Sequence, residues 1–243
     1  MSIEQRAALA AFSACDVSDA LLKLGVPGAG FLADIHPTAF PGPGDPAFGL
    51  KIIAPAFTVL FVPKASPSFP GPLTTPDDLP ESNIPAGTPY ADLITPDTIV
   101  VISQPAGQKC AVVGGIMATR MAKLGARALV VDGRVRDLSC LRGVAQEGGC
   151  PVWSRGTSTI GAGAEAKAHA VNVSVRISGM EVRPEDLVMV DQDEKAVVAI
   201  PRGRVAEVLE LLPGLVKADE RVLVDVEGGG SVKEAFQKYR GKL

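Results

Sequence analysis

The chain has 243 residues, of which 47% are hydrophobic and 21% charged, and its formal net charge is −3 at pH 7. This length allows one domain with a sizeable core, which must be mainly aliphatic because aromatic residues make up only 5% of the chain. The charge excludes the basic field that binds a nucleic-acid backbone, and no apolar run approaches the ~20 residues that span a bilayer.

The cysteines and histidines form neither a disulfide framework nor a zinc pattern. The imidazoles are His36 and His169 alone, and no Cys-x-x-Cys pair occurs. The thiols are widely scattered along the chain: Cys15, Cys110, Cys140 and Cys150. We therefore expect reduced thiols and no zinc. Because the first residues lack the basic and apolar regions of a secretory signal, the expected location is the cytoplasm.

Helical patterns come first along the chain. We expect an alanine-rich helix over residues 3–12 and a second over 16–25, with Asp16 at its start and Gly25 at its end. A strand follows at 56–62. Residues 63–89 carry a proline at almost every fourth position, which neither a helix nor a central strand tolerates. We interpret that segment as a surface loop or an intersubunit arm, with a lid as the alternative.

Strands and helices alternate through the middle of the chain, which is typical of an α/β layer with right-handed crossovers. The expected elements are strands at 98–103, 111–113 and 128–131, helices at 116–124 and 139–146, and a strand from 151. The remainder favours β-structure before two closing helices. We expect strands at 171–177, 180–182, 186–190 and 196–200, and helices at 205–212 and 231–239.

The first candidate site is the Gly114-Gly115 pair at a strand-to-helix junction. Glycines there leave the first amide N–H groups of the helix accessible, and the positive end of the helix dipole favours an anion such as a carboxylate. The alternative is a tight turn without a ligand, since glycine pairs are common in turns.

The second candidate site is the hexapeptide 132–137, Asp-Gly-Arg-Val-Arg-Asp, at the end of an apolar strand. Ligands gather beyond the carboxyl ends of strands in α/β sheets. A carboxylate can bind a hard divalent cation, and a neighbouring guanidinium can hold a substrate carboxylate through two hydrogen bonds. Together they can stabilise a keto-acid enolate. Ordinary surface ion pairing is the alternative.

Other catalytic patterns are weak. Residues 161–166 fit the Gly-x-Gly-x-x-Ala dinucleotide fingerprint, but a β-rich segment follows them, so we interpret them as a turn or a short helix start and expect no nicotinamide cofactor. No Gly-x-Ser-x-Gly motif occurs, and His169 stands alone among alanines, which favours a structural role.

Taken in order, several motifs resemble the RraA-like / 4-hydroxy-4-methyl-2-oxoglutarate aldolase family. The longest is the run 114–137, which joins both candidate sites. The others are 17–21 (Val-Ser-Asp-Ala-Leu), 151–157 (Pro-Val-Trp-Ser-Arg-Gly-Thr), 185–191 and 196–201. The resemblance covers most of the chain. It implies a longer variant, with an α/β domain over residues 1–212, a Pro-rich insertion at 63–89 and a C-terminal helical extension over 213–243.

The resemblance implies a single compact α/β domain of stacked mixed β-sheets flanked by helices, of the swivelling β/β/α type, assembled as a homotrimer or hexamer. It also implies a class II-like lyase that uses Mg²⁺ or Mn²⁺, cleaves 4-hydroxy-2-oxo acids to pyruvate and a second keto acid, and decarboxylates oxaloacetate. Asp137 would be the metal ligand, and Arg136 would bind the substrate and stabilise the enolate. The pyruvyl carboxylate would lie on the backbone amides of Gly114, Gly115, Ile116 and Met117.

One position departs from the family pattern. Many aldolase members carry an acidic residue at the position of Gly115, where it helps to hold the metal's water shell. Asp132 could compensate from a second shell. The departure leaves aldol cleavage, decarboxylation or another keto-acid reaction open. Because some family members lack catalysis and inhibit an RNA-degrading endonuclease by protein contact, a non-catalytic regulator is the alternative function.

Overall fold

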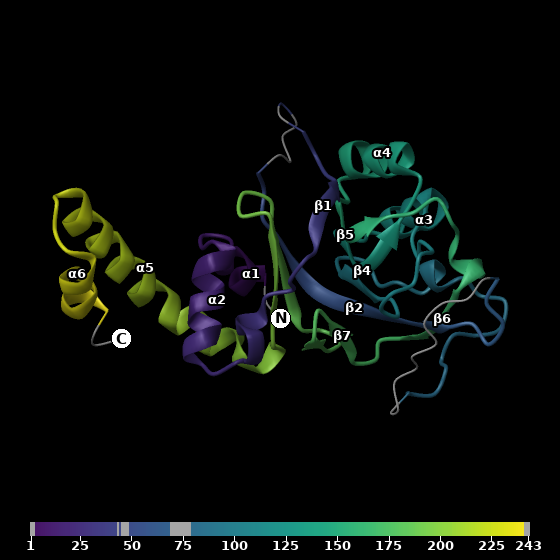
Figure 1. The fold of residues 1–243 in the computed structure, drawn as a ribbon, viewed down its shortest axis with the longest axis horizontal. Helices are drawn as coiled ribbons and strands as arrows, with labels where there is room; N and C mark the ends of the chain where they lie inside the picture. Colours follow the sequence, from purple (N-terminus) through teal and green to yellow (C-terminus); the bar gives the residue numbers. More distant parts are fainter. Residues whose placement is uncertain (1–2, 43, 45–48, 69–78, 241–243) are drawn as a thin grey trace.

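The computed structural model describes residues 3–42, 44, 49–68 and 79–240, and these form a mixed α/β domain (Figure 1). One sheet dominates the described chain, and a separate hairpin pairs β7 (Val175–Ile177) with β8 (Met180–Val182). The sheet order is β1 (His36–Ala39), β5 (Val152–Thr157), β4 (Ala128–Val135), β3 (Ile99–Ser103), β2 (Ile52–Pro63), β9 (Leu187–Asp191) and β10 (Ala196–Ile200), with β6 (Ala166–Val171) on β2. The predicted mixed α/β class is confirmed.

The long strand β2 causes the sheet to curl. Its residues 52–55 pair antiparallel with β9, residues 56–60 pair parallel with β3, and residues 59–63 pair antiparallel with β6. Strands β2 to β5 run parallel to one another, and β2, β3 and the first half of β4 are nearly continuous runs of β-branched and aliphatic residues. Such runs suit strands that are covered on both faces.

Three buried clusters hold the layers together. One packs helices α3 (Gly115–Lys123) and α4 (Leu138–Gly148) onto one face of β3, β4 and β5. A second lies between the two halves of the curled sheet, where Val130 and Trp153 meet Val188 and Val197. The third joins β9 and β10 to α1 (Ile3–Leu9), α2 (Ala14–Lys23) and the start of α5 (Val205–Glu227). The stacked arrangement of sheet halves with flanking helices is thus as expected.

The remaining elements are short, apart from the end of the chain. Helix α6 (Val232–Tyr239) packs on the second half of α5, and both project from the body (Figure 1). Among the described residues, no helix has the length and apolar character of a membrane span. The 3₁₀ helices are η1 (Pro27–Gly30), η2 (Tyr90–Asp92), η3 (Ala162–Ala164) and η4 (Arg202–Arg204).

Several predicted element boundaries are wrong. Residues 111–113 form only isolated bridges instead of a strand, and the first helix ends at Leu9. Three further differences have local causes. Helix α2 starts at Ala14 rather than Asp16, because Ser13 is the N-cap and forms a capping box with Asp16. The strand expected over 171–177 is interrupted, since Asn172 has a left-handed φ of 49°. Helix α5 does not end at residue 212 but continues through Pro213 to Glu227.

The continuation of α5 follows from its apolar spacing. Leu212, Leu215, Ala218 and Val222 are all buried and lie three or four positions apart, so one stripe runs past the proline. The missing N–H of Pro213 removes one helical hydrogen bond, and burial of this stripe outweighs that loss. The domain boundary expected near residue 212 therefore falls inside a continuous helix, and the division of the chain there stays a prediction.

The Pro-rich segment 63–89 is only partly within the described residues, because residues 69–78 lie outside them. Its first residue closes β2, and its last part runs beside β6. The side chain of Asn83 donates to the carbonyl of Val171 and accepts from its N–H, both at 2.8 Å. The carbonyl of Pro80 contacts Nε2 of His169 at 2.7 Å. His169 therefore has the structural environment that the sequence favoured.

Candidate functional site

The glycine turn lies beside the end of β4. The residue before the turn forms a parallel bridge with the last residue of that strand. Gly114 is the N-cap of α3, and the helix begins at Gly115. A Cβ atom on Gly114 would lie 2.8 Å from Oδ2 of Asp137 and 3.2 Å from Nε of Arg136. The absence of a side chain therefore lets these two charged groups lie directly against the backbone of the turn.

Arg136 and Asp137 follow β4 directly. Asp137 has a left-handed backbone (φ 63°, ψ 47°) and is the N-cap of α4. Its Oδ2 accepts a hydrogen bond from the N–H of Gly115 at 3.0 Å and lies 3.9 Å from Nε of Arg136. The two side chains are 42% and 49% exposed, so both are accessible to a ligand. The turn and the charged pair, 22 positions apart in sequence, are thus in contact.

These residues open onto one cavity of about 380 Å³. Gly115 is buried behind it, whereas five of the predicted site residues line it directly: Gly114, Ile116, Met117, Arg136 and Asp137. Within α3 the first helical hydrogen bond runs from Ala118 N–H to the Gly114 carbonyl at 3.0 Å. The N–H groups of Ile116 and Met117 have no acceptor among the described residues and are left for a ligand. The N–H of Gly115 is occupied by Asp137.

Three further residues of the cavity wall were missed from the sequence. Tyr90 donates its hydroxyl proton to the Val112 carbonyl at 3.0 Å, and burial raises the pKa of this hydroxyl. Lys167 brings an exposed cation from β6. A Cβ atom on Gly161 would lie 3.3 Å from Cζ of Arg136, so the guanidinium packs against this glycine.

No local pattern assigned these three residues to this site, because contacts that are remote in sequence bring them to the cavity. The interpretation of residues 161–166 as a turn or short helix start is consistent with η3, which spans three of them. That stretch nevertheless has a second role as the wall beside Arg136.

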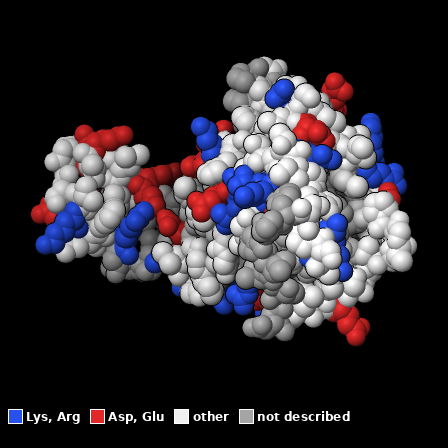
Figure 2. Space-filling view, turned by 45° about the vertical axis from the view of Figure 1, so that its right-hand side comes forward, with Lys and Arg blue, Asp and Glu red and all other residues white. Residues whose placement is uncertain are grey.

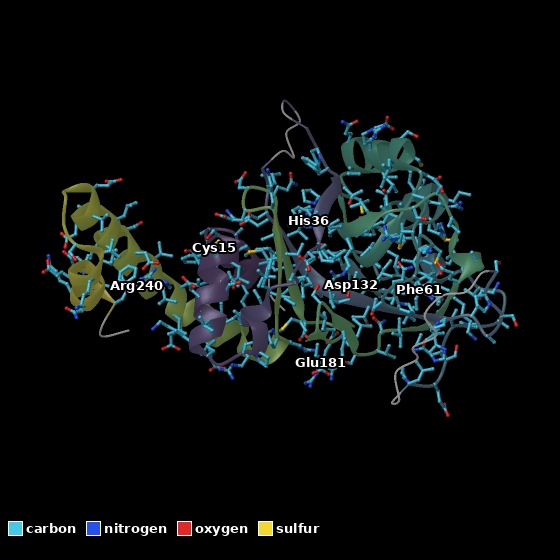
Figure 3. The ribbon with its side chains drawn as sticks, in the orientation of Figure 1. Cys15, His36, Phe61, Asp132, Glu181 and Arg240 are labelled. Carbon is cyan, nitrogen blue, oxygen red and sulfur yellow. The ribbon has the colours of Figure 1, made fainter. Side chains whose placement is uncertain are left out.

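Asp132, by contrast, is directed away from this cavity. Its carboxylate is bound by Nε of Arg155 and by the N–H of Ser178 at 3.0 Å. Burial lowers the pKa of the Arg155 guanidinium, but hydrogen bonds to Asp132 and Asp34 outweigh burial and raise it. Within the described chain, no hydrogen bond or ion pair joins Asp132 to Asp137. The structure places Asp132 on a different cavity. Figure 3 labels this residue near the centre of the molecule.

The residues at Asp137 fit a hard divalent cation only if most of its ligands come from elsewhere. One carboxylate oxygen of Asp137 is engaged by Gly115, and the other has no protein partner in the described residues. Nowhere among the described residues do three or more His, Cys, Asp or Glu side chains form a group that could hold a metal ion. Mg²⁺ is often held by one or two carboxylates, with waters and substrate completing the shell. The donor set is compatible with that mode and not with a closed protein cage.

The chain belongs to the RraA-like family, described as Aldolase/RraA, which it matches over residues 14–197. It is 30% identical over 116 residues to the "Putative 4-hydroxy-4-methyl-2-oxoglutarate aldolase" of Halalkalibacterium halodurans, covering 48% of this chain and 52% of that protein. It is 22% identical over 227 residues to "Protein DlpA" of Legionella pneumophila, covering 93% of this chain and 32% of that protein. The chain thus spans about half and about a third of these relatives' lengths. The family resemblance inferred from the motifs is confirmed.

Two solved structures share the fold. An uncharacterized protein from Pseudomonas syringae pv. tomato superposes with a TM-score of 0.70 at 22% identity, over 97% of this chain and 98% of that one. RraAS2 of Streptomyces coelicolor, described as an unusual member of the RNase ES inhibitor RraA protein family, gives 0.70 at 21% identity, over 90% of this chain and 96% of that one. At these identities the likeness concerns the fold.

Proposed function

We propose that this protein is a lyase of small 2-oxo acids that depends on Mg²⁺ or Mn²⁺. It would cleave 4-hydroxy-2-oxo acids by a retro-aldol step that yields pyruvate, decarboxylate oxaloacetate, or do both. The observation that carries the proposal is the contact between Asp137 and the glycine turn, which places a carboxylate, a guanidinium and free helix amides on one cavity. The membership of the Aldolase/RraA family supports it.

The chain's own residues would bind and orient the substrate. The N–H groups of Ile116 and Met117, at the positive end of α3, suit a substrate carboxylate. The guanidinium of Arg136 can form two parallel hydrogen bonds to the 2-oxo acid and neutralise negative charge that develops on its oxygen. Asp137 would hold the cation, which when bound polarises the 2-oxo group as a Lewis acid.

Bond cleavage leaves the electron pair on the carbon next to the 2-oxo group in both reactions. In the retro-aldol direction the 4-hydroxyl loses its proton and becomes a carbonyl as the bond between carbons 3 and 4 breaks. In decarboxylation the bond between that carbon and the leaving carboxylate breaks, and its electron pair stays on the carbon as CO₂ departs. Protonation of that carbon then gives pyruvate. Among the described wall residues, Arg136 and Lys167 are the cations that could stabilise the charge before protonation.

The direct test measures pyruvate release from oxaloacetate and from 4-hydroxy-4-methyl-2-oxoglutarate with Mg²⁺ and with EDTA. We expect activity with Mg²⁺ that EDTA abolishes and that Asp137→Asn lowers by about 100-fold or more. Glu147→Gln, an exposed carboxylate on α4, is the matched control and should retain full activity. Equal pyruvate release with EDTA, or in Asp137→Asn, would contradict the proposal.

A non-catalytic regulator is the second candidate, and the observation that favours it is Gly115. The position lacks the acidic side chain that many aldolase members carry, and RraAS2, which shares the fold, is described in terms of RNase ES inhibition. This function predicts no metal-dependent turnover of either substrate and a defined protein partner. The proposed assembly as a trimer or hexamer is common to both candidates and can be measured by light scattering.

A further inference from the structure

A second and larger cavity lies at the carboxyl ends of β3 and β4. It has a volume of about 730 Å³, and its walls include the loop 104–108 that follows β3 and residues 132–134 in the second half of β4. Asp132 and Phe61, both labelled in Figure 3, line it, and Phe61 lines the smaller cavity as well. Parallel strands commonly bind ligands beyond their carboxyl ends, and cavities of roughly 300–1,000 Å³ accommodate small organic molecules.

The floor of this cavity is fixed by hydrogen bonds. The side-chain amide of Gln104 is buried, donates to the Cys110 carbonyl at 2.8 Å and accepts from the N–H of Arg134 at 2.8 Å. It lies so close to Gly133 that a side chain there would collide with it. Gln108 is buried too and donates to the Glu165 carbonyl at 3.1 Å. The polar groups of the wall are therefore held in place before any ligand arrives.

The charge of the wall is positive and incompletely neutralised. Three arginines line it, but Asp132 is the one carboxylate among its described lining residues, and Arg155 already pairs with it. Among the described residues, the Arg134 guanidinium donates only to backbone carbonyls, at 3.0 Å to Thr157 and 3.4 Å to Gln108. The Arg176 guanidinium forms no hydrogen bond or ion pair with the described residues. It faces Glu181, its cross-strand partner on β8, but the Glu181 carboxylate is bound by Arg183 at 2.9 Å, so only a longer-range attraction joins it to Arg176. Within the described chain, neither guanidinium is bound to a carboxylate by a hydrogen bond or a close ion pair.

We propose that this cavity is a binding site for a small organic anion with at least two negative charges, either a phosphate ester or a polycarboxylate. Arg134 and Arg176 would supply the charge-assisted hydrogen bonds, for which the planar guanidinium suits both carboxylate and phosphate. Leu60, Phe61 and Pro105 provide apolar wall for the organic part of the ligand. The site is separate from the cavity of Arg136 and Asp137 and does not depend on the activity proposed for it.

The chain contains its own reporter for this site. Its single tryptophan, Trp153, lies on β5 two residues before Arg155, so both side chains are on the same face of the strand. The Trp153 indole is fully buried, and its Nε1 has no partner in the described chain. An anion that binds next to Arg155 should therefore change the fluorescence of Trp153. Calorimetry measures the same binding without depending on that response.

The experiment titrates the full chain with citrate, AMP and inorganic phosphate at constant ionic strength. We expect saturable binding of citrate or AMP with one site per chain. The probe with the higher affinity shows whether the site prefers a polycarboxylate or a phosphate ester. Inorganic phosphate should bind more weakly because it lacks an organic part. Arg176→Gln should weaken binding by about tenfold or more. Arg142→Gln, which removes an exposed arginine on α4, and Asp137→Asn should leave binding unchanged.

Arg176 is exposed, so its substitution should not prevent folding, and Arg134→Gln gives an independent second variant. Three results would each overturn the proposal. One is no calorimetric binding of any of the three probes at about 10 mM, which corresponds to a Kd too weak for a specific site. Another is an affinity that stays equal to that of the parent chain in both Arg176→Gln and Arg134→Gln. The third is a smaller oligomer in Arg176→Gln without anion binding by the parent chain, which would assign the cavity to contact between subunits.

Discussion

Cys140 fills the space in which a side chain at position 115 would lie. A Cβ atom built on Gly115 would be 2.7 Å from Sγ and 2.8 Å from Cβ of Cys140, distances that real Cβ atoms do not adopt. The same glycine donates its N–H to Asp137. Gly115 is therefore matched to a thiol on α4, and the departure from the acidic residue of many aldolases is a paired feature rather than an isolated loss.

This pairing predicts coupling between the two positions. Gly115→Asp alone should destabilise the fold by about 1–3 kcal/mol, because it overpacks the contact between α3 and α4. Cys140→Gly removes both clashing atoms at a cost of about 1 kcal/mol in the helix. The double variant should therefore be more stable than the two single destabilisations added together would predict. Its pyruvate release should also require less Mg²⁺ than that of the parent chain.

Chemical denaturation of the four proteins gives the coupling energy, and Mg²⁺ titration of activity gives the second readout. Gly115→Ala in both backgrounds is the control, since it adds the Cβ without the carboxylate. Strictly additive stabilities would show that Cys140 does not restrict position 115.

The backbone of Asp137 separates its structural from its chemical role. Its left-handed conformation costs most residues about 1–2 kcal/mol, but Asn tolerates it and Gly adopts it freely. Asp137→Ala should therefore be less stable than Asp137→Asn or Asp137→Gly, while all three should lack metal-dependent pyruvate release. Thermal denaturation beside the activity assay checks this order. An active Asn variant would show that the charge of Asp137 is dispensable.

Gly161 offers a test of how Arg136 is positioned. The backbone of Gly161 has φ −77° and ψ 156°, which alanine adopts without strain, but the added Cβ would lie 3.3–3.4 Å from the guanidinium atoms. Gly161→Ala should keep the melting temperature and lower kcat/KM by about tenfold through displacement of Arg136. Gly163→Ala lies in the same turn with nothing within 4 Å and should be silent. Equal kinetics in the two variants would mean that the wall does not position Arg136.

The parts of the site that could be predicted from the sequence are those joined by a local crossover. Strand β3, helix α3 and strand β4 are consecutive, so the glycine turn at the start of α3 and Arg136 after β4 had to meet at the same edge of the sheet. The hydrophobic patterns of β2, β3, β9 and β10 likewise located these four strands. Helix ends were less predictable, because Ser13 and the apolar stripe beyond Pro213 act through capping and packing.

The rest of the site depends on contacts that sequence spacing does not encode. Lys167 reaches the cavity because β6 pairs with the end of β2, where Val62 is its partner about 100 positions earlier. Asp132 is five positions from Asp137, yet a register shift in β4 after Val131 and its pairing with Arg155 direct it to the opposite cavity. Proximity in sequence was therefore a poor guide once the chain was a strand with two faces.

Two buried thiols predict a loss of stability in alkaline solution. Burial raises the pKa of Cys110 to about 11, with a further contribution from Glu165, and burial raises the pKa of Cys150 to about 12. The unfolded chain loses these protons near pH 9, whereas the native chain keeps them, so the unfolded state binds fewer protons between those values. Stability is then full below pH 9 and falls with rising pH, by ~1.4 kcal/mol per pH unit for each thiol.

Urea denaturation between pH 8 and 10.5 measures this slope. Cys150→Ala should reduce the slope by the contribution of one thiol. Cys110→Ala should reduce it by the same amount, but its effect should end near pH 11, where the native Cys110 thiol also loses its proton. Tyr90→Phe is the companion variant, because burial also raises the pKa of Tyr90 and its contribution should enter only above about pH 10. A pH-independent free energy of unfolding, or an unchanged slope in both cysteine variants, would show that the thiols do not govern the alkaline limit. If the slope is smaller in Cys150→Ala, the apolar cluster that surrounds Cys150 between α4 and the sheet is what keeps that thiol protonated in the native state.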